Sequence, residues 1–210
     1  MTDARARILA RLQSSRREAV AEQSPAGPGT TGTAAMTEML ERFTRGLEKV
    51  FATHETVTTE AQISKAIERY LNQLDAGDEL VVAPAVSKAG LLDNSSLQQR
   101  LAPTRGNEKN AVTLAYAGIA ETGSLVMLSA ADTPMTTNFL PDNFICVLKT
   151  RDVLNDMEAL WSRMASEQRT MPRCLSLITG PSRTADVEQI IQMGAHGPRR
   201  VHVILWANST

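Results

Sequence analysis

Four residues with chemically useful groups, Glu121, Thr122, Gly123 and Ser124, stand between two apolar runs in A-G-I-A-E-T-G-S-L-V-M (117–127). Small and polar residues between β-compatible runs predict a tight strand–turn–strand, in which Gly123 is free to adopt a positive φ. Such a turn presents a carboxylate, two hydroxyls and a glycine amide at a strand end, a common place for ligands in α/β proteins. The alternative is a hairpin turn whose glutamate is solvated and whose hydroxyls satisfy the local backbone.

A second group of polar residues follows the apolar run C-L-S-L-I-T (174–179), which predicts a buried strand. Gly180 supplies a turn, Ser182 or Thr184 is placed to N-cap a short helix, and Arg183 adds a cation. Backbone amides at a helix N-terminus beside an arginine favour an anion site. Two acidic residues further along the same predicted helix would compete with that anion, so a capped loop without ligand remains the alternative.

Asn138, in T-T-N-F-L-P, and His196, in G-A-H-G-P, are the remaining candidates. In a doubly wound sheet, the turns after the strands gather at the carboxyl edge. We therefore expect Asn138, His196 and both polar groups described above to share one crevice suited to a small polar anion, such as a carboxylate. In that crevice Arg183 would pair with the charge and Glu121 would carry any proton or acyl chemistry. In the alternative arrangement each loop caps its own element, and the side chains point apart.

The composition excludes several classes of function. Lys+Arg 22 against Asp+Glu 23 gives a net charge of −1, which offers no electrostatic case for nucleic acid or an anionic membrane. The two cysteines, Cys146 and Cys174, form no C-x-x-C pair, so we expect no zinc ribbon, iron–sulfur cluster or other cofactor in the chain. Both lie in apolar runs and are predicted to be buried, reduced thiols of a cytoplasmic protein. No apolar run approaches the roughly 18 residues of a membrane span, and the basic start lacks the apolar segment of a signal peptide.

Periodicity divides the chain into three parts: a basic helix over residues 1–23, a flexible Pro- and Gly-rich linker over 24–35, and a domain over 36–210. Helical spacing begins at Met36, and Thr59 with Gln62 forms a capping-box pattern before a second helix that should stop near Gly77. A further helix is expected from about Thr150 to Met164. Strands are predicted over 54–58, 79–83, 111–120, 125–129, 144–148, 174–179 and 201–206. This order of elements predicts an α/β layer fold.

Four segments together resemble the lactate-utilisation protein C family, the LUD domain: A-G-I-A-E-T-G-S-L-V, T-T-N-F-L-P, L-I-T-G-P-S-R-T-A-D-V-E and G-A-H-G-P-R-R-V-H-V-I-L. The likeness runs from about residue 36 to residue 206. It implies a three-layer fold like that of the NagB/RpiA/CoA-transferase group, a mostly parallel sheet with helices on both faces, carrying here an N-terminal helical arm. It also implies a role in a bacterial system that oxidises L-lactate to pyruvate with iron–sulfur partner proteins. The resemblance supplies no catalytic residues.

Two classes of function remain open. The first is a cytoplasmic, non-redox subunit of an L-lactate oxidising complex, whose loops bind a small carboxylate or contact a partner. The second is a stand-alone CoA-transferase-like enzyme, because Glu121-Thr122-Gly123 is similar in outline to the glutamate and glycine that such enzymes carry at a strand end.

Overall fold

The computed structural model of the chain describes residues 33–101, 104, 106, 108–185, 191–193 and 196–207. The predicted basic helix of residues 1–23 and most of the predicted linker lie outside the described residues. The first described helix, α2, spans Thr33–Lys49. It begins three residues before Met36, so its first turn uses residues that the composition assigned to the linker. Among the described residues, no helix has the length and apolar character to cross a membrane.

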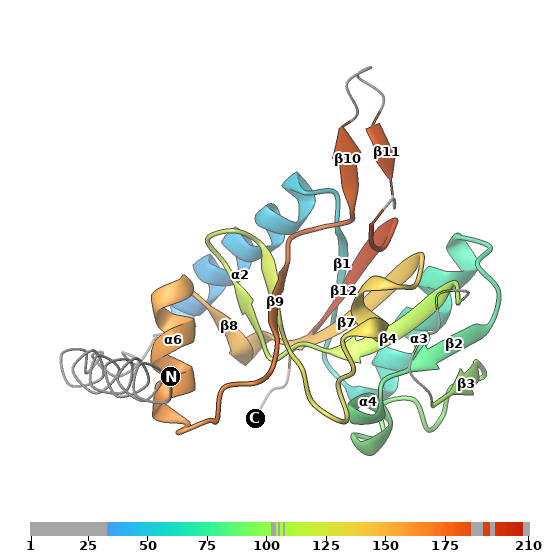
Figure 1. The fold of residues 1–210 in the computed structure, drawn as a ribbon, viewed down its shortest axis with the longest axis horizontal. Helices are drawn as coiled ribbons and strands as arrows, with labels where there is room; N and C mark the ends of the chain where they lie inside the picture. Colours follow the sequence, from blue (N-terminus) through green and yellow to red (C-terminus); the bar gives the residue numbers. More distant parts are fainter. Residues whose placement is uncertain are drawn as a thin grey trace, which may run out of the picture.

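A six-stranded parallel sheet, the main sheet, forms the centre of the fold (Figure 1). Its strands, in spatial order, are β1 (Thr53–Val57), β12 (Arg200–Trp206), β7 (Asn143–Lys149), β4 (Asn110–Leu114), β2 (Glu79–Val82) and β3 (Gln98–Arg100). The central strands are buried on both faces, which explains their nearly continuous apolar sequence. Because side chains alternate along a strand, Val201 and Val203 face one side of the sheet while His202 and Ile204 face the other.

A second sheet packs against one face of the main sheet, in the order β8 (Val153–Leu154), β5 (Ala117–Ile119), β6 (Ser124–Leu128) and β9 (Leu175–Ile178). This sheet corrects two expectations. The predicted strand over 111–120 is two strands, β4 and β5, in different sheets. The predicted strand over 174–179 is β9, which pairs antiparallel with β6 and takes no part in the main sheet. Cys174, predicted to be buried, is exposed beside this edge strand.

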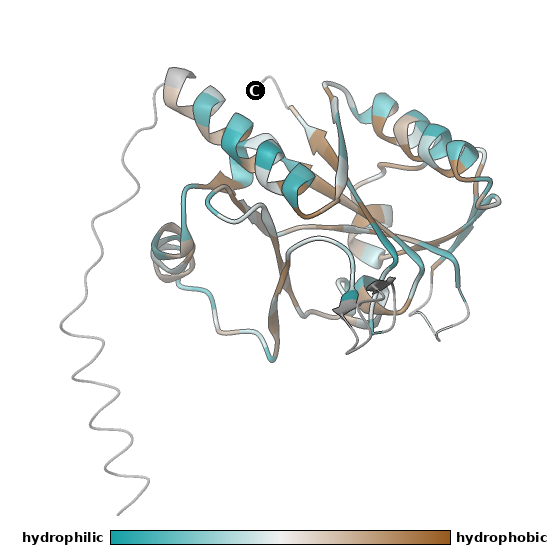
Figure 2. Cartoon of the chain, turned by 90° about the horizontal axis from the view of Figure 1, so that it is seen from above, coloured by the Kyte–Doolittle hydropathy of each residue, from teal (hydrophilic) through white to brown (hydrophobic). Residues whose placement is uncertain are grey.

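Helices cover both sides of the main sheet, as the three-layer expectation required. On one face lie α3 (Glu60–Gln73) and α4 (Pro84–Lys88). On the other lie α2, the short α5 (Thr136–Phe139) and the second sheet, whose outer face is covered by α6 (Met157–Ser166). Figure 2 shows the strands mostly brown, whereas the helices carry hydrophilic residues on their outer sides.

Local signals explain where the helices begin and end. The Gln62 Oε1 accepts hydrogen bonds from the amides of Thr58 (2.8 Å) and Thr59 (3.2 Å), which confirms the capping box of α3. This helix ends at Gln73, before Gly77, with Asp75 in the left-handed region at φ 48°. The start of α6 differs from the prediction: residues 150–154 form a 3₁₀ turn and β8. Asp156 then caps α6 by accepting a bond from the Ala159 amide at 2.9 Å.

His202 is buried between the main sheet and α3. Its ring stacks on Tyr70, with centroids 4.0 Å apart, and its Nδ1 lies 2.8 Å from the Thr53 hydroxyl. Its Nε2 has no hydrogen-bond partner. Burial, helped by the nearby charges of His54 and Arg69, lowers the pKa of His202 to about 4. The native protein therefore keeps this imidazole neutral well below the pH at which an unfolded chain would protonate it.

This buried imidazole predicts a pH-dependent stability. An unfolded histidine has a pKa near 6.5, so between pH 6.5 and 4 the unfolded chain binds a proton at this residue and the native chain does not. As the pH is lowered through this range, the free energy of unfolding therefore falls by about 1.4 kcal/mol per pH unit. We expect His202→Phe, which keeps the stack on Tyr70, to remove about 2 kcal/mol of the loss between pH 7 and pH 5. Urea unfolding at both pH values measures it. The exposed His196→Gln is the control and should keep the wild-type loss; equal losses in both variants would refute the assignment.

Candidate functional site

The turn of residues 121–124 joins β5 to β6 as the sequence predicted. The two strands pair antiparallel, with Ile119 opposite Ser124, and the Gly123 amide donates to the Ile119 carbonyl at 2.9 Å. Gly123 has a φ of 66° and lies directly against Gly46 of α2: a Cβ on Gly123 would come within 2.4 Å of the Gly46 carbonyl carbon. Both the conformation and this contact require glycine, so the turn is fixed against α2.

A row of three hydroxyls, which we call the hydroxyl row, connects this turn to the end of β9. The Ser124 Oγ lies 2.6 Å from the Thr122 Oγ1 and 2.7 Å from the Thr179 Oγ1. Ser124 is buried, whereas the two threonines are exposed. Three hydroxyls at these distances form a chain that accepts a proton at one end and donates one at the other. The row is therefore open to a ligand or to water at its two exposed ends, Thr122 and Thr179.

The loop after β9 differs from its prediction. Ser182 and Thr184 do not N-cap a helix; instead β10 (Arg183–Ala185) pairs antiparallel with β11 (Ile191–Met193), and the hairpin extends from the body in Figure 1. Because β9 lies in the second sheet, its loop does not reach the carboxyl edge of the main sheet. A Cβ on Gly180 would meet the Val50 carbonyl oxygen at 2.5 Å, just before β1 begins. The predicted anion site at a helix N-terminus is therefore wrong.

The same loop contacts the segment before β12. The Ser182 amide donates to the Pro198 carbonyl at 2.8 Å, and Gly197 packs against the Ser182 side chain. His196, one residue before Gly197, is exposed. Arg183 stacks its guanidinium 3.8 Å from the centroid of the exposed Phe51 ring. The loop thus lies at the amino ends of β1 and β12, opposite the predicted edge.

The remaining predicted site residues are Glu121, Asn138 and Thr184, and their described contacts do not join them into one shared cluster. Glu121 is exposed, its amide donates to the Asn155 carbonyl at 3.1 Å, and its carboxylate forms no hydrogen bond or ion pair within the described part of the chain. Asn138 is buried on α5, against β4 and β7, where its amide nitrogen contacts the Met135 sulfur at 3.6 Å. This hydrogen bond does not connect Asn138 to the turn or to the loop. The side chain of Thr184 lies outside the described residues.

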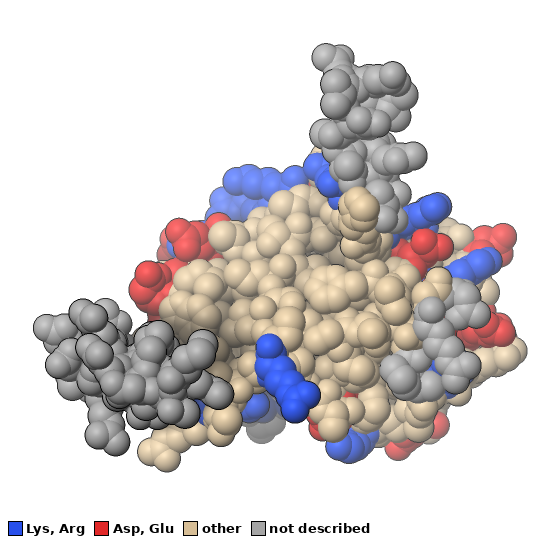
Figure 3. Space-filling view, in the orientation of Figure 1, with Lys and Arg blue, Asp and Glu red and all other residues tan. Residues whose placement is uncertain are grey.

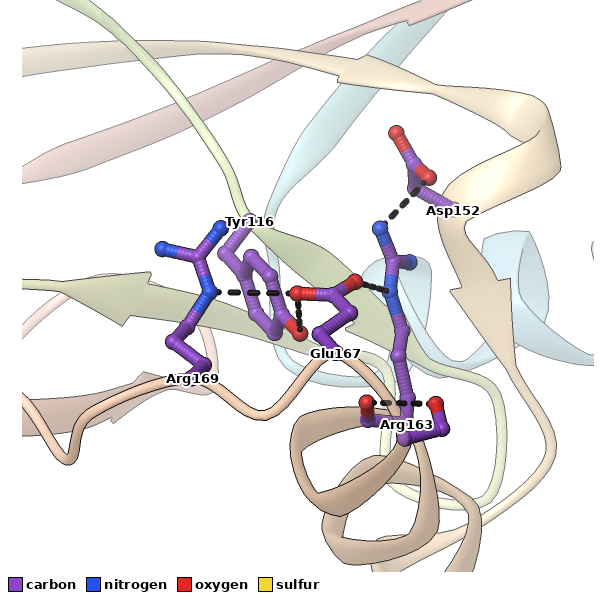
Figure 4. A network of polar contacts seen from close by, with 6 residues as sticks. Tyr116, Asp152, Arg163, Glu167 and Arg169 are labelled. Atoms are coloured by element: carbon purple, nitrogen blue, oxygen red, sulfur yellow. Dashed lines mark hydrogen bonds and ion pairs between the residues drawn. The ribbon is translucent and has the colours of Figure 1, made fainter.

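The carboxyl edge of the main sheet carries a polar cluster that the sequence reasoning missed (Figure 4). At its centre, the Glu167 carboxylate accepts bonds from the Tyr116 hydroxyl (2.9 Å), the Arg163 Nε (2.9 Å) and the Arg169 Nε (3.1 Å). Arg163 is also paired with Asp152 at 3.0 Å. Both guanidinium groups lie over the Tyr116 ring, 4.7 and 5.0 Å from its centroid. Tyr116 falls inside the strand predicted over 111–120, so its place just after the end of β4 became apparent only in the structure.

Hydrogen bonding decides the protonation of this cluster. Burial alone would raise the pKa of Glu167, but bonds from Arg163, Arg169 and Tyr116 outweigh it and hold that pKa below its usual value. Burial and the bond to Glu167 both raise the pKa of Tyr116. Near neutral pH the cluster therefore holds a carboxylate, a neutral phenol and two arginines in fixed positions.

A pocket of about 320 Å³, which we call the carboxyl-edge pocket, opens beside this cluster. It is lined by Ala85, Leu114, Ala115, Tyr116, Leu128, Ser129, Ala130, Asp132, Thr133, Arg169, Thr170 and Pro172. These residues come from the ends of β4 and β6 and from the segments after β2 and α6. It lies at the edge where ligands bind in open parallel sheets, although the residues that line it are not the predicted ones.

The described residues contain no group of three or more His, Cys, Asp or Glu side chains that could hold a metal ion. Burial raises the pKa of the Cys146 thiol far above its usual value, so that thiol is neutral and inert. Cys174 is exposed, with its sulfur 3.4 Å from the Ser176 hydroxyl. The two cysteines thus occupy different environments, and only Cys174 is accessible.

The parallel main sheet, the second sheet on one face and the helices on both sides define an α/β protein with a pocket at the carboxyl edge of its main sheet. Its family follows from the sequence profile of the LUD domain, which matches residues 40–206. The chain belongs to the LUD domain family, which confirms the resemblance drawn from its motifs.

Individual proteins of known sequence that resemble this chain share less than a third of the aligned residues with it. Uncharacterized protein YkgG of Escherichia coli K12 is 29% identical over 186 residues, 79% of this chain and 78% of that protein. Lactate utilization protein C of Geobacillus thermodenitrificans is 28% identical over 125 residues, and that of Bacillus subtilis 29% over 97. These two matches cover 58% and 45% of this chain, and 52% and 40% of the relatives' lengths.

A solved structure shares the fold. The crystal structure of a DUF162 family protein from Deinococcus radiodurans superposes with a TM-score of 0.61 at 22% identity, over 81% of this chain and 97% of that one. At this identity the likeness supports the α/β architecture and says nothing of activity.

The contact of the turn with α2 predicts unequal effects at two glycines of positive φ. Gly123→Ala combines left-handed strain with a collision against Gly46, and we expect it to lower the free energy of unfolding by about 3 to 5 kcal/mol. At Gly77, φ 81°, an added Cβ meets no atom within 4 Å, so Gly77→Ala should cost only the strain, about 1 to 2 kcal/mol. Denaturant unfolding compares them; equal losses would mean that the close approach of the two glycines does not exist.

Proposed function

We propose that the chain is a subunit of a bacterial L-lactate utilisation system, in which L-lactate is oxidised to pyruvate together with iron–sulfur partner proteins. The observation that carries this proposal is the LUD domain match over residues 40–206, together with relatives named lactate utilization protein C. The system would work in the cytoplasm, where the two unpaired cysteines stay reduced.

The chemistry of the reaction supports a division of labour among subunits. Oxidation of lactate to pyruvate releases two electrons and two protons, and the electrons need an acceptor. An iron–sulfur cluster takes about four thiolate ligands, whereas the whole chain has two cysteines, and one of these is buried as a neutral thiol. Clusters would therefore belong to the partner proteins, and this chain would bind substrate or organise the complex.

The surface offers a place for such a partner at β9. This strand is at the edge of the second sheet, so its outer backbone groups are unpaired among the described strands. Leu177 on β9 and Met171 just before it are exposed apolar residues. In Figure 3 the centre of this face is mostly uncharged except for one basic side chain just below it, and the other Lys, Arg, Asp and Glu residues lie mainly toward the rim. An uncharged centre with a charged rim is typical of a protein interface, and the unpaired backbone groups of an edge strand can hydrogen-bond to a strand of a partner.

This proposal predicts a specific loss of association. The tagged chain, purified from cells grown on L-lactate, should retain proteins that contain iron and acid-labile sulfide. Leu177→Asp should reduce the recovered iron at least about tenfold, because it places a charge at the proposed interface. The control Leu140→Asp changes a leucine of equal exposure, 44%, on the segment after α5 and should reduce it less than about twofold.

Growth experiments test the proposed role in L-lactate utilisation separately from the proposed interface at β9. A strain that lacks the chain should grow normally on glucose and fail on L-lactate, with growth restored by the wild-type chain. Normal growth of that strain on L-lactate would reject the proposed function. Restored growth with Leu177→Asp at full iron recovery would reject only the β9 interface.

The second candidate, a CoA-transferase-like enzyme, is favoured by the environment of Glu121. Its carboxylate is exposed, has no partner among the described residues, and projects from the turn that carries the hydroxyl row. Such an enzyme attacks the acyl-CoA thioester with a carboxylate, releases the CoA thiolate and forms an acyl–glutamyl anhydride. This candidate ranks second because the carboxyl-edge pocket does not include Glu121.

A direct assay decides this second candidate. If it holds, the purified chain should exchange acetyl-CoA with L-lactate to give lactyl-CoA, detected by mass spectrometry, and Glu121→Gln should lower the rate at least about a thousandfold. Glu158→Gln, which changes an exposed glutamate on α6, should leave the rate unchanged. Absence of transfer by the wild-type chain, or an equal rate in Glu121→Gln, would remove the candidate.

A further inference from the structure

Arg169 is held in place while most of its hydrogen-bond donors remain unused. Its Nε donates to Glu167 at 3.1 Å, and its guanidinium lies over the Tyr116 ring. In Figure 4 its two terminal nitrogens point away from Glu167, and they form no hydrogen bond or ion pair within the described ranges. A guanidinium has five N–H donors in a rigid fork, so four of them remain available.

The backbone before Arg169 adds a second sign of a fixed position. Gln168 has a φ of 48°, a left-handed conformation that costs a non-glycine residue about 1 to 2 kcal/mol. Through this residue the chain leaves α6, and the Arg169 amide donates back to the Met164 carbonyl at 3.3 Å. Strained residues persist where the surrounding structure determines them, and they are frequent at ligand sites. Gln168 directly follows the C-cap of α6, where a left-handed residue commonly ends a helix, and this turn leads the chain to Arg169 at the carboxyl-edge pocket.

The rest of the pocket supplies neutral polar groups and an apolar wall. Ser129 accepts a bond from the Cys174 amide at 2.9 Å and keeps its hydroxyl proton free, while Thr133 donates to the Leu128 carbonyl at 2.7 Å and keeps its lone pairs. Leu114, Ala115 and Leu128 form the apolar side. Asp132 also lines the pocket, and its carboxylate forms a surface ion pair with Lys88 at 3.1 Å.

From this arrangement we propose that the carboxyl-edge pocket binds a small monocarboxylate with an oxygen on C2, such as a 2-hydroxy or 2-oxo acid. The terminal nitrogens of Arg169 would form a paired contact with the carboxylate. The hydroxyls of Ser129 and Thr133 would bond the C2 oxygen, one as donor and the other as acceptor, and the apolar wall would contact the methyl group. A volume of about 320 Å³ is at the small end for ligand pockets, as such an acid requires.

This inference deepens the proposed function and rests on it for the choice of ligand, whereas the anion chemistry rests on Arg169 alone. The chain also supplies a matched control. Arg169 and its partner Glu167 have side chains 48% and 31% exposed; Arg69 and its partner Glu55, on α3 and β1, are 51% and 32% exposed. Arg69 does not line the pocket. Substitution at either site therefore removes one positive charge and one surface ion pair with a glutamate, and at Arg169 it also removes the contact with the Tyr116 ring.

Titration of the full chain by isothermal calorimetry or NMR tests the pocket with three probes: L-lactate, pyruvate and propionate. We expect lactate or pyruvate to bind with a dissociation constant of about a millimolar or below, and propionate, which lacks the C2 oxygen, at least about tenfold more weakly. Arg169→Gln should weaken binding at least about tenfold. The affinity of Arg169→Lys should lie between those of Arg169→Gln and the wild type, because lysine keeps the charge but lacks the paired N–H donors of the guanidinium. Arg69→Gln should stay within about twofold of wild type.

The outcomes distinguish the pocket from the function. No saturable binding of any probe, or equal affinity in Arg169→Gln and wild type, would overturn the pocket assignment, while the growth test on L-lactate would stand independently. Equal affinity for propionate and lactate would overturn the role of the C2 oxygen. A third outcome is also possible: the probes bind in a way that depends on Arg169, yet a strain that lacks the chain grows normally on L-lactate. That outcome would support the pocket and reject the lactate system as its context.

Discussion

The contact between Gly46 and Gly123 determines how the two sheets are joined. At this point the backbone of α2 meets the backbone of the β5–β6 turn with no side chain between them. The helix also packs against β1 of the main sheet and β8 of the second sheet, so one element contacts both sheets. The carboxyl-edge pocket is formed from the ends of β4 and β6, one from each sheet, so its shape follows from how the two sheets are packed together. Dense packing makes such positions sensitive to single atoms.

Much of the fold was predictable from the sequence, and the exceptions share a cause. Apolar runs located the strands because burial on both faces leaves a continuous signal, and Gly123 marked its turn because few other residues adopt that conformation. The run at 174–179 was equally visible, yet nothing in it specifies whether its neighbour is β6 or a strand of the main sheet. Strand partners are set by long-range packing, so the loop from Gly180 to Thr184 was assigned to the wrong edge.

The candidate site shows the same limit more sharply. The predicted residues form two groups: a turn and a loop connected by the hydroxyl row, and Asn138, which is buried elsewhere. The cluster around Glu167 was missed because its members, Tyr116, Arg163 and Arg169, are ordinary surface types at unremarkable positions. Only the spacing of Arg163 and Glu167, four apart on a helix, predicts an ion pair. What gives the cluster its chemistry is the meeting of a strand end with a helix end, which a linear sequence does not display.

The open edge of β9 has a consequence for the production of this protein in a cell. The outer edge of β9 is unpaired among the described strands and carries the exposed Leu177, and an edge of this kind can pair with the same strand of another copy. If the proposed partner covers this edge, a cell that makes the chain in excess of that partner would hold copies whose β9 edge stays open to such pairing. Matched synthesis, or assembly while the chain is still on the ribosome, would protect the strand. On that proposal, the open edge would make the solubility of the chain depend on the amount of partner present.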